Sequence, residues 1–195
     1  MLAFRTAQTG VSSFVRLAGR RRAVTAAVAA FAVVLATITG TPAAANATTP
    51  VSAATLQLES TLEAGMLALL NSERAAHHLS ALVWSSALHA SSYSHDVQMA
   101  KYDDMTHQCP GEAAPGTRIT KSGYNWQSWG ENIGWTTTET VSGIDAMETT
   151  MYNEKAPDDG HRLNILGNFK NIAIDVYVDP VHHIIWYTQD FGYPA

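Results

Sequence analysis

The sequence has very little cysteine: one residue, Cys109, in a chain of 195. A disulfide within the chain needs two cysteines, so none can form. Small secreted domains are often held together by disulfides, whereas this chain must rely on a hydrophobic core. The single thiol leaves two possibilities open, a free thiol or a link between two chains.

Basic residues are also scarce beyond the N-terminal region. Of the 12 Lys and Arg residues, five are arginines within residues 1–22, whereas all 17 Asp and Glu residues come later. Without that region, seven basic residues face 17 acidic ones, a net charge of −10. An acidic domain attracts neither nucleic acid nor anionic lipid electrostatically. We therefore expect no nucleic-acid partner.

The N-terminal region has the three parts of a secretory signal. The arginine-rich residues 1–22 precede the apolar run "AVTAAVAAFAVVLATITG", and "TPAAANA" then offers small-residue cleavage sites near Ala45 or Ala47. This order predicts a signal peptide over residues 1–47 and a secreted protein without a stable membrane span. A membrane anchor is the alternative, since about 18 apolar residues is the lower limit for a span. The export route, Sec or twin-arginine, stays open.

The remaining chain is predicted to contain a short linker over residues 48–58 and one domain over residues 59–195. Apolar spacing predicts a first helix over 59–77, and a second helix begins near Ser85, a favourable N-cap. A third helix follows Thr136, which has capping-box spacing to Glu139.

Residues 103–130 are polar and rich in Gly and Pro, so we predict mostly loop, with one helical turn at Arg118–Ser122. The segment "NIAIDVYV" alternates apolar and polar residues, and "HHIIWYTQDFG" follows it, which indicates a closing β-hairpin. Helices followed by strands predict an α+β domain with helices packed on an antiparallel sheet.

The segment "WGENIGW" places Glu131 between two glycines and two tryptophans. Glutamate is rarely buried without a partner, while tryptophan is usually well covered. Glu131 therefore either faces water or is held in a pocket by specific partners.

The chain contains five motifs in a fixed order: "LLNSERAAHHLSALVWSSAL", "THQCP", "GENIGW", "MYNEKAPDDGHRLNILGNFKNIAI" and "WYTQDFG". Together they resemble the CAP superfamily, which comprises cysteine-rich secretory proteins, antigen 5, pathogenesis-related 1 and bacterial secreted SCP-domain relatives. The resemblance extends from Thr61 to Gly192 and implies a three-layer α-β-α sandwich with a cleft lined by two His and two Glu. The eukaryotic disulfides and cysteine-rich tail are missing, so the bacterial branch is the better match.

By this resemblance the four cleft residues are His107, Glu131, Glu154 and His161, each expected in a loop or at the end of an element. Two neutral imidazoles can hold zinc or another divalent metal. The carboxylates, Glu131 and Glu154, are the catalytic candidates: they can ligate the metal, orient the imidazoles or accept a proton from bound water. The simpler alternatives are a structural acceptor at Glu131, an exposed helix end at Glu154 and a helix cap at His161. His95 is expected to be a hydrogen-bonded packing residue.

Three classes of function remain open. The domain is either a binding module for a lipid, peptide or cell-wall ligand, a metal-dependent hydrolase of the peptidase type, or a purely structural or interaction domain. We favour the binding module, for which nearby aromatic side chains would form the walls of the site; core packing is the alternative role for these rings. The aromatic residues are Tyr124, Trp126, Trp129 and Trp135.

Overall fold

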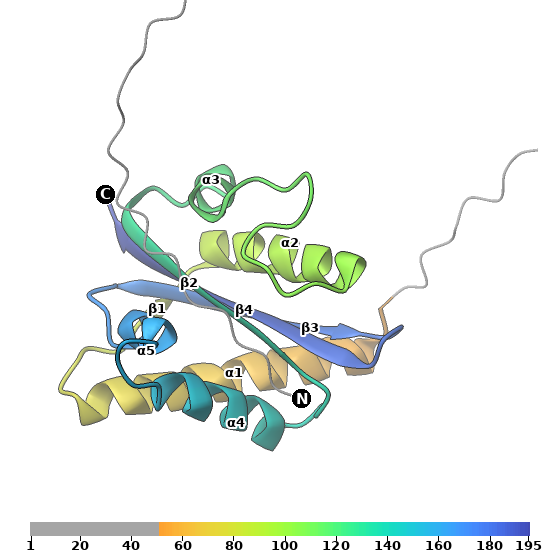
Figure 1. Ribbon diagram of the computed structural model, residues 1–195, viewed down its shortest axis with the longest axis horizontal. Coiled ribbons are helices and arrows are strands. Elements are labelled where there is room, and N and C mark those ends of the chain that lie inside the picture. The colour runs from red at the N-terminus through yellow and green to blue at the C-terminus, as the bar shows by residue number, and fades with distance from the viewer. Residues whose placement is uncertain (1–50) are drawn as a thin grey trace, which may run out of the picture. The chain divides into compact units, whose positions relative to one another are not determined.

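The computed structural model describes residues 51–195 (Figure 1). The predicted signal peptide lies outside the described residues. Five helices and four strands are present in this part of the chain. In chain order they are α1 (Ala53–Ala76), β1 (Val83–Trp84), α2 (Ser86–Tyr102), α3 (Pro115–Lys121), β2 (Trp126–Thr136), α4 (Val141–Tyr152), α5 (Gly160–Ile165), β3 (Asn171–Asp179) and β4 (Ile184–Pro194).

The strands form one sheet in the order β1-β3-β4-β2. The predicted hairpin is β3 and β4, and β4 also pairs antiparallel with β2, which is an edge strand. The two-residue β1 pairs with β3 in parallel, so the sheet is antiparallel apart from this short addition. A two-residue strand has no periodicity that a sequence could reveal. The predicted α+β class and its three layers are confirmed.

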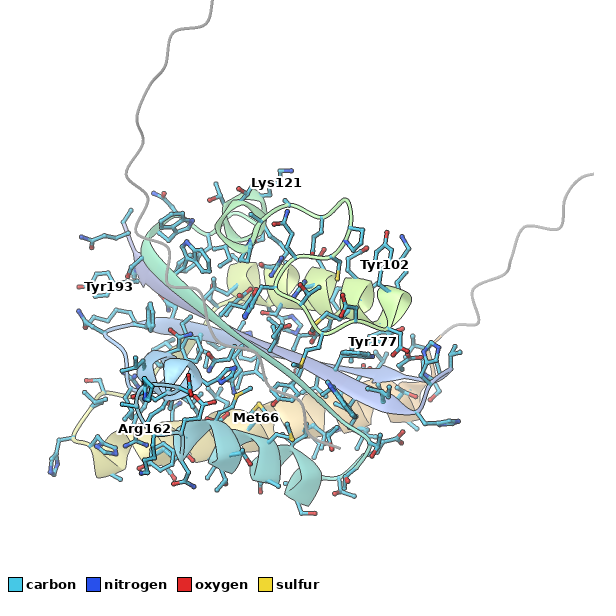
Figure 2. All side chains as sticks on the ribbon, in the orientation of Figure 1. Met66, Tyr102, Lys121, Arg162, Tyr177 and Tyr193 are labelled. Atoms are coloured by element: carbon cyan, nitrogen blue, oxygen red, sulfur yellow. The ribbon has the colours of Figure 1, made fainter. Side chains whose placement is uncertain are left out.

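Helices cover both faces of the sheet, with α1, α4 and α5 on one side and α2 and α3 on the other (Figure 1). Alternate residues of a strand point to opposite faces. Ile172, Ile174 and Val176 of β3 accordingly pack with α1 and α4, in the layer where Figure 2 labels Met66. Ala173, between two of them, packs with α2 and α3 on the other face.

Two helix starts differ from the prediction. The helix expected from Glu59 begins at Ala53, because the Ser52 hydroxyl accepts a hydrogen bond from the Thr55 amide at 3.0 Å. Residues 53–58, predicted as linker, are therefore helical. The expected capping box at Thr136 was wrong, because that residue ends β2 and Thr140 caps α4 instead.

The segment 103–130 is more ordered than predicted. A helix, α3, begins at Pro115, whose fixed φ suits the first turn of a helix. The expected helical turn forms part of α3, with Ser122 as its C-cap. The edge strand β2 begins at Trp126, inside the stretch predicted as loop. Within residues 51–195, no helix combines the length and apolar character needed to cross a membrane.

Candidate functional site

Two His–Glu pairs contain the four residues predicted for the site. Nδ1 of His107 lies 2.8 Å from Oε1 of Glu131. Nδ1 of His161 lies 2.5 Å from Oε1 of Glu154, whose Oε2 accepts the His161 backbone amide at 3.0 Å. Glu131 and His161 are each 1 % exposed, so neither pair is a loose surface contact. Each predicted glutamate therefore has one predicted histidine as its partner.

The two pairs reach the edge strand β2 from opposite faces of the sheet. Glu131 lies in the middle of β2, so the expectation that it belongs to a loop or element end was wrong. The next residue, Asn132, points to the other face and donates to the His161 carbonyl at 3.3 Å. Asn164 of α5 donates to the Glu131 carbonyl at 3.3 Å and to Asn132 Oδ1 at 2.9 Å. These bonds fix α5, and with it His161, against the strand that carries Glu131.

The glycines on either side of Glu131 make this close approach possible. A Cβ at Gly130 would lie 2.7 Å from the Asn164 side-chain oxygen. A Cβ at Gly134 would overlap the Tyr187 hydroxyl group. The glycines of "WGENIGW" are therefore required by packing on the α5 side of β2, the face opposite Glu131.

Arg118 of α3 is a further residue of the site that the sequence did not indicate. Its guanidinium is buried, pairs with Glu131 and lies 3.3 Å from Glu112. Burial alone would raise the pKa of Glu131, but Arg118 and the His107 hydrogen bond outweigh it and lower this pKa to about 2. Glu131 is therefore ionised at all physiological pH values. The sequence offered one general signal for Arg118: an acidic domain with few basic residues has few counter-charges for a buried carboxylate.

Comparison with known proteins identifies the fold. Residues 67–191 match the sequence model of CAP, the cysteine-rich secretory protein family. The chain belongs to the CAP family. None of the curated protein sequences matches this CAP domain significantly.

Two solved structures share its fold. An extracellular protein containing a SCP domain from Bacillus anthracis str. Ames superposes with a TM-score of 0.62 at 24% identity, over 74% of this chain. The chain spans only 45% of that protein's length. An outer surface protein from Borrelia burgdorferi gives a TM-score of 0.60 at 12% identity, covering 69% of this chain and 94% of that one. At these identities the likeness establishes the fold alone.

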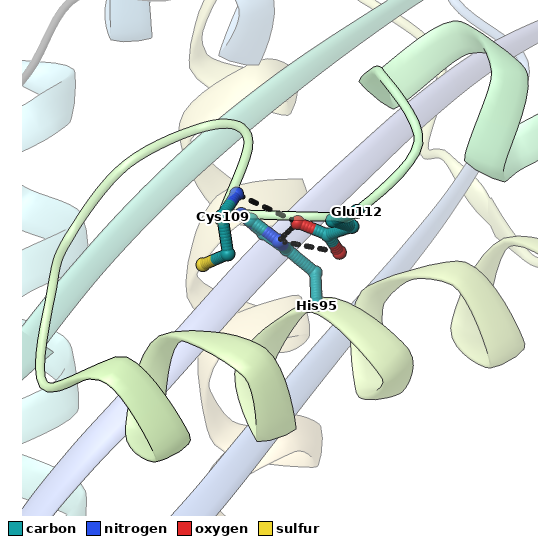
Figure 3. Close-up of side chains that lie close together, drawn as sticks. All are labelled: His95, Cys109 and Glu112. Atoms are coloured by element: carbon teal, nitrogen blue, oxygen red, sulfur yellow. Dashed lines mark hydrogen bonds and ion pairs between the residues drawn. The ribbon is translucent and has the colours of Figure 1, made fainter.

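Glu112, which pairs with Arg118, is itself held by His95 and by the backbone amide of Cys109 (Figure 3). Both carboxylate oxygens of Glu112 lie 3.0 Å from Nδ1 of His95, and the Cys109 amide donates to one of them at 3.0 Å. The buried His95 is thus a hydrogen-bonded packing residue, as predicted.

The same three side chains could be considered as metal ligands, because their ligand atoms lie within 4.8 Å of one another. However, the Glu112 carboxylate already accepts from His95 and the Cys109 amide and pairs with the Arg118 cation. Burial and the nearby Glu112 charge also raise the pKa of the Cys109 thiol to about 11, which disfavours the thiolate that a metal requires. We therefore assign this cluster to the support of Glu131 through Arg118.

The aromatic residues near the site belong to the core of the CAP domain. Tyr124 is buried, and the Trp126 and Trp129 rings meet edge to face with centroids 6.4 Å apart. Both tryptophans pack against the cluster that joins α2 to α3, and Trp126 donates to the Thr120 hydroxyl at 2.9 Å. Trp135 packs against a second cluster between α2 and the sheet. The packing alternative therefore accounts for these rings.

Proposed function

We propose that this CAP domain is an extracellular binding module in which His107 and His161 hold a divalent metal such as zinc beside a polar ligand. The observation that carries the proposal is the pairing of each imidazole with a carboxylate through Nδ1. A carboxylate at Nδ1 fixes the proton there and places the ring's lone pair on Nε2, the arrangement common behind metal-binding histidines. In this proposal the glutamates orient the histidines.

The surroundings of the site support a metal chemically. Ionised Glu131 supplies negative charge next to His107, and the carboxyl group of Glu154 contacts His161. The hydrogen bonds of Asn132 and Asn164 hold α5, which carries His161, against β2 beside Glu131, so both pairs lie at the same position along this strand. Rigid support of this kind is what a precise ligand set requires. A bound divalent metal would supply a Lewis acid that attracts carbonyl or carboxylate oxygens.

The state of the carboxylates favours binding over hydrolysis. A general base works best with a pKa near the working pH, whereas that of Glu131 is about 2. Glu154 uses one oxygen for the His161 imidazole and the other for its backbone amide. Both carboxylates are thus engaged in positioning histidine, which leaves the metal-dependent hydrolase as the weaker alternative.

The kind of ligand and the location follow from two further observations. Because the nearby aromatic rings are used for packing, a peptide or a polar cell-wall component suits the site better than a lipid. The order of basic, apolar and small residues in the N-terminal region supports secretion. The two related structures are described as extracellular and outer-surface proteins, which agrees with that location.

Calorimetric titration of the mature protein with zinc tests the proposal. We expect His161→Ala to weaken zinc binding at this site at least about 100-fold, since even changes behind a ligand cost 10–100-fold. His182→Ala is the matched control, because His182 also pairs with a carboxylate, Asp179, at 2.7 Å but lies exposed at the hairpin tip. Equal zinc affinity in both variants would exclude the metal. Turnover of a peptide or ester panel by the zinc-loaded protein would favour the hydrolase.

A further inference from the structure

The outer edge of β3 carries a second group of metal-type side chains. In the part of the chain that the structure describes, β1 pairs only with Asn171 and Ile172, so the edge beyond them has no neighbouring strand. Helix α1 runs along this edge, and Oε1 of its Glu59 accepts the Val178 amide at 2.9 Å. The first residues of α2 flank the same edge, because the Ser85 amide donates to the Ile172 carbonyl at 2.9 Å.

Three side chains from three elements converge there. Nε2 of His89 in α2 lies 3.1 Å from Oδ1 of Asp175 in β3 and 3.4 Å from Oε1 of Glu63 in α1. All three ligand atoms lie within 4.8 Å of one another. Around a tetrahedral ion with bonds of about 2.1 Å, ligand atoms stand about 3.4 Å apart. The observed spacing therefore already suits a shared ion.

The three residues are held rigidly, yet an ion can reach them. Leu62 and Leu88, the neighbours of Glu63 and His89, are fully buried, and Asp175 lies between two core residues of β3. The His89 side chain is 34% exposed and that of Glu63 is 17% exposed, whereas Asp175 is 4% exposed. The cluster is thus buried at Asp175 and exposed to solvent at His89.

A second buried carboxyl group, that of Asp96, lies behind Asp175. Among the described residues, no N–H or O–H of another residue reaches Oδ2 of Asp175 or Oδ2 of Asp96, but the two carboxyl groups hydrogen bond with each other. The other Asp96 oxygen accepts from the Thr188 hydroxyl. A buried carboxylate is costly unless it is paired, and a cation on the exposed side of Asp175 would add to the hydrogen bond from Asp96.

Several carboxyl groups lie in this cluster. Glu63 of α1 and Asp175 of β3 contact His89, and Glu59 of α1 lies near both of them. Hydrogen bonds to Asp175 and Glu63 raise the pKa of His89 to about 10, so a metal ion that binds here must displace the His89 proton. Burial and the adjacent Asp175 raise the pKa of Asp96 far above its ordinary value, so Asp96 keeps its proton at neutral pH.

We propose that Glu63, His89 and Asp175 form a divalent-cation site at the edge of β3, separate from the His107 and His161 pairs. One imidazole nitrogen with two carboxylate oxygens suits a transition-metal ion such as Zn²⁺ or Mn²⁺. Ca²⁺ prefers six to eight oxygen ligands and suits the set less well. The ion would join α1, α2 and β3 in a chain that has no disulfide.

The mature protein titrated with MnCl₂ and followed by NMR shows where a cation binds, because Mn²⁺ broadens the amide signals near it. We expect broadening around His89 and Asp175, with at least about a 100-fold loss of Mn²⁺ affinity at this position in His89→Ala. Asp175→Asn, which keeps the side chain's shape, should lose binding likewise, and circular dichroism shows whether each variant is folded. His182→Ala should bind like the wild type.

The site is also distinguishable from the proposed His107 and His161 site. His161→Ala should leave the broadening at the β3 edge unchanged and remove only that near Glu131. If the wild type shows broadening at the β3 edge but none near Glu131, the proposed function is overturned and this inference still stands. Equal Mn²⁺ affinity in folded wild type and His89→Ala, or no broadening at the β3 edge, would overturn the inference itself.

Discussion

Replacing Arg118 by methionine should expose how strongly the site depends on one buried cation. The change keeps most of the side-chain length but removes the charge that faces Glu131 and Glu112. Both carboxylates would then be buried without their main counter-charge. Breaking a buried ion pair in this way costs about 3–5 kcal/mol.

The shift in the pKa of Glu131 gives an independent magnitude. That pKa falls from an ordinary 4.5 to about 2 in the folded protein. Since one pKa unit corresponds to about 1.4 kcal/mol, the folded state favours ionised Glu131 by about 3 kcal/mol. The two routes agree, so we expect Arg118→Met to lower the free energy of unfolding by about 3–5 kcal/mol at pH 7.

The pH dependence provides the sharper test. Because the folded-state pKa of Glu131 is lowered, its stabilisation is complete above pH 4.5 and is lost as the pH falls through 2. The difference between wild type and Arg118→Met should therefore shrink by about 2 kcal/mol between pH 7 and pH 3. Urea unfolding followed by circular dichroism at several pH values measures it.

A matched control lies on the same helix. Lys121 of α3 is exposed, so Lys121→Met should change the free energy of unfolding by less than about 0.5 kcal/mol. A difference below about 1 kcal/mol for Arg118→Met at pH 7, or one that does not vary with pH, would refute the assignment of Arg118 as the counter-charge of Glu131.

Three further outcomes are expected. Asn164→Ala leaves two buried acceptors on β2 without a donor and should cost about 2–3 kcal/mol in urea unfolding, against almost nothing for the exposed Asn168→Ala. Burial raises the pKa of Glu73 to about 7 beside the buried Glu148; such a raised pKa stabilises the fold below pH 4.5 and loses that effect as the pH rises through 7. The free energy of unfolding should thus fall between pH 5 and pH 8, and a fall undiminished in Glu73→Gln would contradict this. Cys109 should react with iodoacetamide at least about 100-fold more slowly in the folded than in the urea-unfolded protein, and equal rates would contradict its burial.

The parts of the fold that a sequence can predict are those with a strong local period. The spacing of Leu62 and Met66 predicted α1, and the alternation from Ile172 to Val178 predicted β3. Strand β2 was missed because its central residues, from Gly130 to Gly134, are buried on both faces and include two glycines. A strand packed on both sides has no alternation, and glycine indicates a turn more often than a strand.

The candidate site was predictable in its members and not in its connections. Resemblance to the CAP superfamily supplied His107, Glu131, Glu154 and His161, and the fold pairs each histidine with a glutamate. Nothing local predicted Arg118, because the need for it arises only when the fold buries Glu131. Tertiary burial creates the requirement for a counter-charge, so only the assembled structure reveals it.

The cluster of Glu63, His89 and Asp175 shows even more clearly that a sequence does not reveal which side chains the fold brings together. Glu63 and His89 lie on different helices, and Asp175 lies on a strand more than 80 residues after His89. Each alone suits an ordinary polar surface position, and no motif joins them. What makes them a site is the open edge of β3, which leaves α1 and α2 to cover a strand with side chains in place of a neighbouring strand. Charged side chains are a common protection for an exposed sheet edge. Here the same charges stand at the separation that a metal ion requires, so protection of the edge and binding of a cation are chemically compatible roles for one set of residues.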